Sequence, residues 1–212
     1  PAPKGTITIQ GANGSYKGQV GLASLETVKN DYADFADTTY AVSGGSFTKA
    51  VLPEYCAAGF VPVENEGGTF GVKVAPAAKI GTVEYATLAD AIAAAKDGET
   101  VLLLADTELT DYITVDKAVT LDLGGKTVTA NLTSKYAFAV TADVTFKNGA
   151  INITNNNGGI SVAGKLTLVD VDITGAAVNA PLLYLIGSTE TTIDKDSTVT
   201  ATSSSANSYP AI

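Results

Sequence analysis

The sequence predicts an all-β fold: a right-handed parallel β-helix (solenoid) with a short capping α-helix and a small β-rich linker module. Three observations lead to this prediction. Apolar residues recur in columns at one repeat length, glycines fall at the corners between repeats, and a short amphipathic segment precedes the first repeat. Repeats of this length are typical of solenoids, in which each coil packs only on its neighbours.

Three apolar columns run through the second half of the chain, with steps of 20–26 residues between members. The first column comprises Val115, Val140, Val162, Ile186 and Ile212. The second comprises Leu121, Phe146, Leu168 and Ile193, and the third Val128, Ile153, Ile173 and Val199. Apolar and polar residues alternate along each segment, which predicts strands with one face in the core. Glycine pairs such as Gly124-Gly125 are expected at the corners, where a positive φ is needed.

The segment TLADAIAAAKDG, residues 87–98, is expected to form the capping helix. Its apolar residues share one helical stripe; they are Leu88, Ala91, Ile92 and Ala95. Thr87 is placed as the N-cap, with Asp90 three residues later in the position of a capping box. Such a helix would cover an end of the solenoid that otherwise exposes apolar side chains and unpaired backbone.

Two runs resemble known proteins. YATLADAIAAAKDGETVLLLADTELTDYITVDKAVTLDLGGKTV, residues 85–128, looks like the opening of pectin-lyase-like right-handed β-helix domains. YAVSGGSFTKAVLPEYCAAGFVPVENEGGTFGVK, residues 40–73, is similar to a module between β-helix units in large adhesin-like surface proteins of Gram-positive gut bacteria. The resemblance implies an extracellular or cell-surface protein built from such repeats.

This pattern predicts three segments. Residues 1–47 are expected to form a terminal β-helix coil plus a helical excursion, as the end of a preceding repeat unit. Residues 48–79 are expected to form the β-rich linker module, and residues 80–212 the capping helix and the β-helix coils.

The two ends of the chain match each other in register. GTITIQGANGSYKG, residues 5–18, reads like a last coil, whereas the final SYPAI reads like the first strand of an unfinished coil. Counting seven residues past Ile212 into a following copy reaches Ile7, an apolar position. The chain is therefore either a piece cut from a longer protein or a repeat that stacks head to tail. The predicted assembly contacts are Ile7, Ile9, Tyr209 and Ile212.

Composition excludes several functions. The net charge is −9, which argues against nucleic acid and anionic membrane surfaces as partners. The chain has no His, Trp or Met, and all 13 basic residues are Lys. It therefore lacks the commonest general base and metal ligand, and the bidentate clamp for carboxylate or phosphate. No apolar run long enough to span a bilayer and no signal peptide is seen, and we expect no membrane insertion in this segment. The lone Cys56 is expected to be a small buried residue.

Acidic residues are the only candidates for enzyme chemistry. Polysaccharide lyases on this fold use acids, usually with Ca²⁺, beside a Lys or Arg base. The pairs here are Asp170/Asp172 and Asp194/Asp196, with Lys195 inside the second pair and with Asp122 and Lys147 at positions equivalent to Asp194. Pairs on different coils do not make a calcium cage, so we expect a solvated face, no catalytic residue, no metal and no cofactor.

Threonine and tyrosine leave two further alternatives open. Two threonine ladders are expected on outer faces: Thr120, Thr145, Thr167 and Thr192, and Thr129, Thr154, Thr174 and Thr200. Such ladders occur in ice-binding proteins, but threonine also simply suits exposed strands, and the neighbouring column is broken at Asn152 and Asp172. The tyrosines that could stack on sugars are Tyr112, Tyr136, Tyr184 and Tyr209. Of these, Tyr184 is expected to pack in the core.

The sequence thus favours a non-enzymatic structural and adhesive protein of a cell surface, either a stalk repeat or a head-to-tail fibre subunit. Its expected partners are other copies of itself, and glycans or a host surface. The alternative is a carbohydrate-binding or polysaccharide-lyase-like module.

Overall fold

The computed structural model describes residues 6–9, 39–132, 136–154, 158–177, 179–187, 190–202 and 210–212. For residues 6–9, 39 and 40 the description covers the backbone alone. The helical excursion expected within residues 1–47 falls on residues 10–38, outside the described part. The chain divides into two compact units, Pro1–Ala75 and Pro76–Ile212.

Within its described residues, the first unit holds two small sheets and one short helix. Its elements are β1 (Thr6–Ile9), β2 (Thr39–Val42), the 3-10 helix η2 (Pro53–Tyr55), β3 (Phe60–Glu64) and β4 (Phe70–Val74). β1 and β2 pair in parallel, as neighbouring coils of a solenoid do, whereas β3 and β4 form an antiparallel hairpin. A separate small core of Val42, Phe47, Val51 and Tyr55 holds the segment around η2.

The second unit holds the solenoid and its cap. The elements before the coils are β5 (Ala78–Ile80), β6 (Val83–Tyr85) and α2 (Leu88–Ala94). The short coil strands are β7 (Thr100–Leu103), β8 (Thr107–Leu109), β9 (Ile113–Val115), β11 (Phe138–Val140), β13 (Ile160–Val162), β15 (Leu183–Leu185), β16 (Thr191–Ile193) and β17 (Thr198–Ala201). The long coil strands are β10 (Thr120–Ala130), β12 (Asp143–Ile153) and β14 (Lys165–Gly175).

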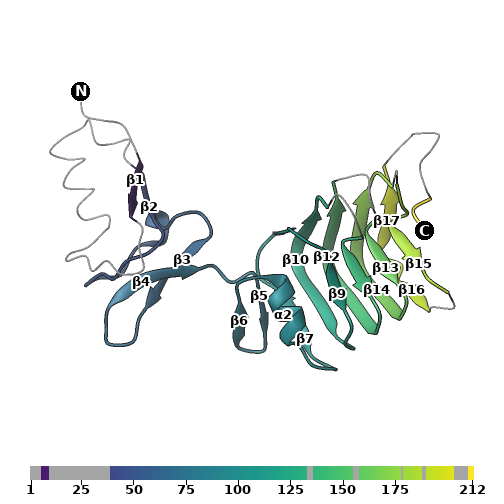
Figure 1. Ribbon diagram of the computed structural model, residues 1–212, viewed down its shortest axis with the longest axis horizontal. Coiled ribbons are helices and arrows are strands. Elements are labelled where there is room, and N and C mark those ends of the chain that lie inside the picture. Colours follow the sequence, from purple (N-terminus) through teal and green to yellow (C-terminus); the bar gives the residue numbers. More distant parts are fainter. Residues whose placement is uncertain are drawn as a thin grey trace. The chain divides into compact units, whose positions relative to one another are not determined.

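All pairing between coils is parallel, and the predicted right-handed parallel β-helix is confirmed (Figure 1). One sheet has the order β9-β11-β13-β15, and the other runs from β16 through β14, β12 and β10 to β7. The long strands pass through a corner, so that β8 pairs with the second half of β10 and β17 with the second half of β14. Alternating side chains are buried in both halves of β12, Val144 and Phe146 before the corner and Ile151 and Ile153 after it.

The second apolar column is confirmed, because Leu121, Phe146, Leu168 and Ile193 are successive partners. The third column is wrong in one member: Ile151, not Ile153, pairs with Val128 and Ile173. The cause is the corner. Four residues separate Asp122 from Lys126 in β10, but only two separate their partners Lys147 and Gly149 in β12.

The first column is wrong at its fourth member, where Leu185 is the partner of Val162. Ile186 follows the strand and is 46% exposed. The predicted register is thus wrong by one residue, and such an error reverses the face of every side chain in the strand, because side chains alternate along it. Tyr184, which we expected in the core, is accordingly 45% exposed.

The capping helix is confirmed, but it ends at Ala94 and not at the expected Asp97-Gly98. Its N-cap is Thr87, whose Oγ1 accepts a hydrogen bond from the Asp90 N–H at 3.0 Å. Leu88, Ala91 and Ile92 are buried against the solenoid core. Beside the helix, β5 pairs antiparallel with β7 and closes that face of the first coil. Lys117 fixes the other end, since its Nζ donates to the Ala93 carbonyl at 2.6 Å.

The core of the second unit is wholly apolar among the described residues, with no buried polar or charged side chain. Phe138 and Phe146 meet inside it edge to face, with ring centroids 5.1 Å apart. Aromatic pairs in this geometry stabilise the fold by more than the burial of their apolar area alone provides. The apolar core therefore stabilises the stack of coils by hydrophobic packing. Among the described residues of this unit, polar and ionisable side chains are confined to the outer faces and the ends.

Candidate functional site

The predicted assembly residues lie near the two ends of the chain. Ile7 and Ile9 are on β1, where their backbones pair with Tyr40 and Val42. Ile212 is 53% exposed, and Tyr209 lies outside the described residues. Ile7 and Ile9 belong to the first unit and Ile212 to the second, and their role as contacts between copies stays a prediction.

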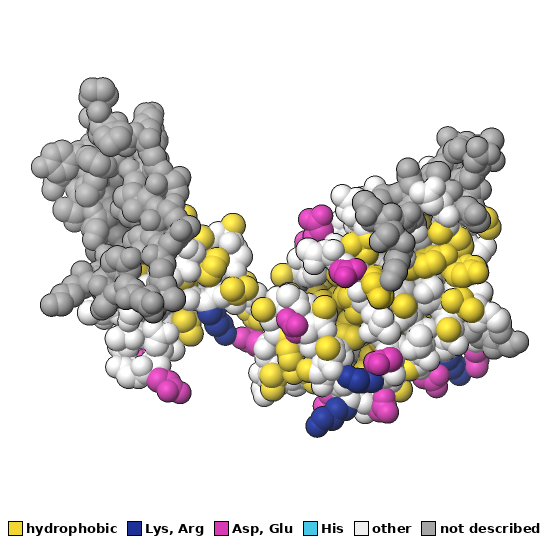
Figure 2. All heavy atoms as spheres, in the orientation of Figure 1, with side chains coloured by type: hydrophobic (Ala, Val, Ile, Leu, Met, Phe, Trp, Pro, Cys, Tyr) yellow, Lys and Arg dark blue, Asp and Glu magenta, His cyan; other side chains and the backbone are white. Residues whose placement is uncertain are grey.

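In the last coil, formed by β15, β16 and β17, some inward positions are less covered than those of the earlier coils, although Leu183 stays buried. Leu185 is 37% exposed, whereas its column partners Val140 and Val162 are fully buried. Ile193 and Val199 are partly buried and pack on the edge of the core. Figure 2 shows hydrophobic side chains gathered on the surface of the coils at this end. Burial of apolar surface is the main driving force of association, so this end is a candidate contact surface.

The acidic residues of the two pairs accept hydrogen bonds at the corners of the coils. The Asp194 carboxylate accepts hydrogen bonds from the Ser197 hydroxyl at 2.6 Å and from the Asp170 N–H at 3.2 Å. These bonds, the one from Ser197 foremost, hold the pKa of Asp194 below its usual range. Asp172 accepts from the Thr198 hydroxyl, and Lys195 pairs with Asp196. Within the described residues no three His, Cys, Asp or Glu side chains are grouped to hold a metal ion.

Asp122 is a second carboxylate with several partners. It accepts from the Asn148 amide and from the Gly124 N–H, both at 3.0 Å, and lies 3.1 Å from Lys147 Nζ. Burial acts to raise the pKa of Asp122, but these three partners outweigh it and hold the pKa below the ordinary value. Lys147 thereby forms an ion pair that joins two coils. A shallow groove of about 270 Å³ runs beside it, past Lys126, Asn148 and Asp170.

One threonine ladder is confirmed and one is wrong. Thr120, Thr145, Thr167 and Thr192 are successive partners across four coils. In the other ladder Asn152, not Thr154, stands between Thr129 and Thr174, for the corner reason given above. The neighbouring column has Ala150 and Asp172 in place of threonine, so no regular array two threonines wide extends over the coils.

Two of the tyrosines form a pair that the sequence did not predict. The rings of Tyr136 and Tyr184 stack with centroids 5.5 Å apart and planes 5° apart. Gly158 belongs to the intervening coil, and a Cβ there would overlap the ring of Tyr136. The signal in the sequence was the glycine at that position, but spacing alone does not show that rings two coils apart lean together.

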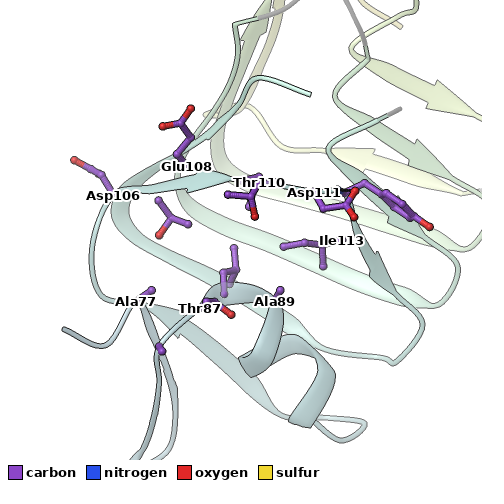
Figure 3. A pocket seen from close by; sticks show the side chains of 13 residues that line it. Ala77, Thr87, Ala89, Asp106, Glu108, Thr110, Asp111 and Ile113 are labelled. Atoms are coloured by element: carbon purple, nitrogen blue, oxygen red, sulfur yellow. Dashed lines mark hydrogen bonds between the residues drawn. The ribbon is translucent and has the colours of Figure 1, made fainter. Parts of the chain in front are cut away.

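A second feature that sequence reasoning missed is a hollow at the capped end of the solenoid, which we call the end hollow. Its volume is about 330 Å³. It lies between the start of α2 and the β8–β9 segment, and is lined by Ala77, Ala86, Thr87, Leu88, Ala89, Asp106, Thr107, Glu108, Leu109, Thr110, Asp111, Tyr112 and Ile113. Figure 3 shows Thr87 and Ala89 on one side and Thr110 and Ile113 on the other, with Asp106 and Glu108 at the rim. The volume falls at the low end of the roughly 300–1,000 Å³ of known ligand pockets.

Cys56 is partly buried beside η2, and its Sγ contacts the Leu52 carbonyl oxygen at 3.7 Å. Burial, and secondarily the charge of Glu54, raise the pKa of the thiol. A thiol that resists ionisation is a poor nucleophile. Its place agrees with a packing role.

Comparison with protein families, curated proteins and solved structures found no match for the chain. The resemblance to pectin-lyase-like domains and to surface adhesins therefore stays a prediction. Among the described residues no helix has the length and apolar character needed to cross a membrane.

Proposed function

We propose that this chain is a non-enzymatic structural and adhesive protein of a bacterial cell surface. In this proposal it is a repeat unit of a stalk, or of a fibre in which the C-terminal open coil of one copy is completed by the N-terminal strand of the next. The observation that carries the proposal is the partial exposure of the inward column in the last coil, at Leu185. An uncovered coil is a template for further strands.

Two other features support assembly. β1 already pairs in parallel with β2, so the N-terminal segment has the backbone conformation of a coil strand. The Ala211 carbonyl accepts from the Leu183 N–H at 3.0 Å, which places the C-terminal residues beside the last coil in the manner of a further strand. Contacts between unlike surfaces that do not close on themselves build filaments.

The test is negative-stain electron microscopy of the purified chain over a concentration series, with light scattering on the same samples. We expect rods that lengthen with concentration. Ile212→Asp and Ile7→Asp should each abolish growth, because a charge would be buried at the joint. Val83→Asp is the matched control, since Val83 is 56% exposed on β6, far along the chain from both ends. Short particles at every concentration would overturn the fibre and leave the stalk repeat.

The alternative is a carbohydrate-binding or lyase-like module, which the Tyr136–Tyr184 pair favours because Tyr184 is 45% exposed. Aromatic faces at a surface are suited to stacking on sugar rings. Affinity electrophoresis through gels containing neutral or acidic polysaccharides would show retardation that Tyr184→Ala removes. Lyase activity on acidic glycans would appear as ultraviolet absorbance of an unsaturated product. We expect no such product, because Lys147 and Lys195 are held in ion pairs.

A further inference from the structure

The end hollow coincides with an open strand edge. β8 pairs with β10 on one side, and no other described strand pairs with it. On the neighbouring face of the same coil, β5 covers β7, so the cap closes one face and leaves β8 bare. An unpaired edge offers backbone N–H and C=O groups to an added strand. The buried side chain of Leu109 in β8, with Leu88 and Ile113, lines the hollow directly beside that edge.

The rim of the end hollow is acidic. Asp106, Glu108 and Asp111 line it, and no lysine does. One oxygen of Asp106 accepts from the Thr127 N–H and one of Asp111 from the Tyr112 N–H, both within 2.9 Å. These bonds fix the two carboxylates without neutralising them, and none of the ion pairs within the described part of the chain involves the three acids.

From the open edge, the apolar hollow and the acidic rim, we propose that the end hollow binds an extended basic segment of another protein. The segment adds a parallel or antiparallel strand to β8. One apolar side chain enters the hollow between Leu88, Leu109 and Ile113, and lysine or arginine residues on either side face the rim acids. Backbone pairing with a pocket for alternate side chains is an established mode of peptide recognition.

Charge complementarity disfavours a second copy of this chain as the occupant. The exposed apolar end of the solenoid carries Glu190, Asp194 and Asp196 around Lys195, and Lys195 is already paired with Asp196. Docking that end on the rim would bring like charges together in a chain of net charge −9. The rim acids thus protect the edge against self-association while leaving it open to a basic strand. This site is separate from the proposed fibre joint, so either proposal can fail alone.

The test is fluorescence anisotropy of the full chain with a labelled acetyl-Lys-Thr-Leu-Thr-Lys-amide peptide. Saturable binding is expected, weakened about tenfold when glycine replaces the peptide's leucine, because one buried apolar side chain is lost. Replacing both peptide lysines with glutamate should weaken binding further, and added salt should weaken the basic peptide only. Glu108→Gln with Asp111→Asn should weaken the basic peptide about threefold, as expected for partly exposed charge pairs.

Ala89→Leu fills the hollow from the exposed face of α2 and should weaken peptide binding about tenfold by steric exclusion. Ala94→Leu is the matched control, because Ala94 is exposed on the same helix but does not line the hollow. Circular dichroism melting of both variants checks that the fold is retained. Equal binding of the basic and acidic peptides, equal effects of the two alanine variants, or no saturable binding would overturn the proposal. Self-association that Ala89→Leu alone abolishes would instead assign the hollow to a second copy.

Discussion

Tyr136 and Tyr184 stack on one another across a whole coil, with ring centroids 5.5 Å apart. Neighbouring coils are separated by about 4.8 Å, so rings that start two coils apart must lean toward each other to meet. Ser161, which pairs with Tyr184, and Gly158 occupy the coil between them. The absence of a side chain at Gly158 is what leaves the space for the Tyr136 ring.

Gly158→Ala should therefore destabilise the solenoid by about 1–3 kcal/mol, the usual cost of overpacking. Urea denaturation followed by circular dichroism measures it. The change should cost clearly less in a Tyr136→Ala background, because the added methyl then meets no ring; the Pro181 carbonyl oxygen, 2.9 Å from the added atom, keeps part of the cost. An equal cost in both backgrounds would show that the ring is not what requires glycine.

The Asp122 side chain links two coils, and we expect its removal to lower the free energy of unfolding. Asp122→Ala leaves Asn148 and Gly124 without their acceptor and Lys147 without its ion pair. We expect a loss of about 1–3 kcal/mol at neutral pH. Asp116→Ala is the control, since Asp116 is exposed and should cost within about 0.5 kcal/mol.

The same carboxylate predicts a pH dependence. Because its pKa is lower in the folded chain than the ordinary 3.8, the stabilisation is complete above pH 3.8 and is lost as the pH falls through the folded value. The difference in unfolding free energy between the wild type and Asp122→Ala should therefore shrink on acidification. A difference that is constant down to strongly acidic pH would contradict the assignment.

Whether a register error is an even or an odd number of residues explains which parts of the fold could be predicted from the sequence. The corner at Gly124-Gly125 is two residues longer than the corner at Asn148, and a fixed repeat length cannot show this. An error of two residues keeps the face of a strand, so Ile153 was correctly predicted to be buried although it belongs to the adjacent column. An error of one residue in the register reverses the face of a strand. Placing Ile186 opposite Val162, where Leu185 belongs, therefore also placed Tyr184 in the core by mistake.

The end hollow could not be predicted for a different reason. Local signals specify α2, since Thr87, Asp90 and the apolar stripe are all read within two turns. How much of the first coil a seven-residue helix covers depends on where it docks, and no periodicity encodes that. The hollow exists because α2 and β5 cover β7 and the edge of β9, and leave β8 open.

The N-cap of α2 offers a direct test of the cap. Thr87→Ala removes the acceptor of the Asp90 N–H and should lower stability by about 1 kcal/mol, whereas Thr87→Ser should retain most of it. Thr114→Ala, at an exposed position of β9, is the matched control. Thermal melting by circular dichroism compares the three. A serine variant as unstable as the alanine variant would show that the methyl group, not the hydroxyl, matters.

The aromatic pair in the core should dominate the stability of the coil stack. Phe146→Ala removes a fully buried ring that meets Phe138 edge to face, and should cost about 3–5 kcal/mol. Thr145→Ala, one residue away on the outer face, should cost much less. Urea denaturation of both variants measures the contrast. Comparable losses would mean that the threonine ladder stabilises the coils as strongly as the core does.

Cys56 should react slowly with iodoacetamide at neutral pH while the chain is folded. Burial, with a smaller contribution from the charge of Glu54, raises the thiol pKa above its ordinary 9.0 and so reduces the reactive thiolate. Urea should release the full reactivity. Glu54→Gln removes the second cause and should speed the reaction of the folded chain by less than about tenfold, because burial remains. Glu64→Gln, an exposed acid on β3, is the control and should leave the rate unchanged. A folded rate equal to the rate in urea would place the thiol in solvent and overturn its packing role.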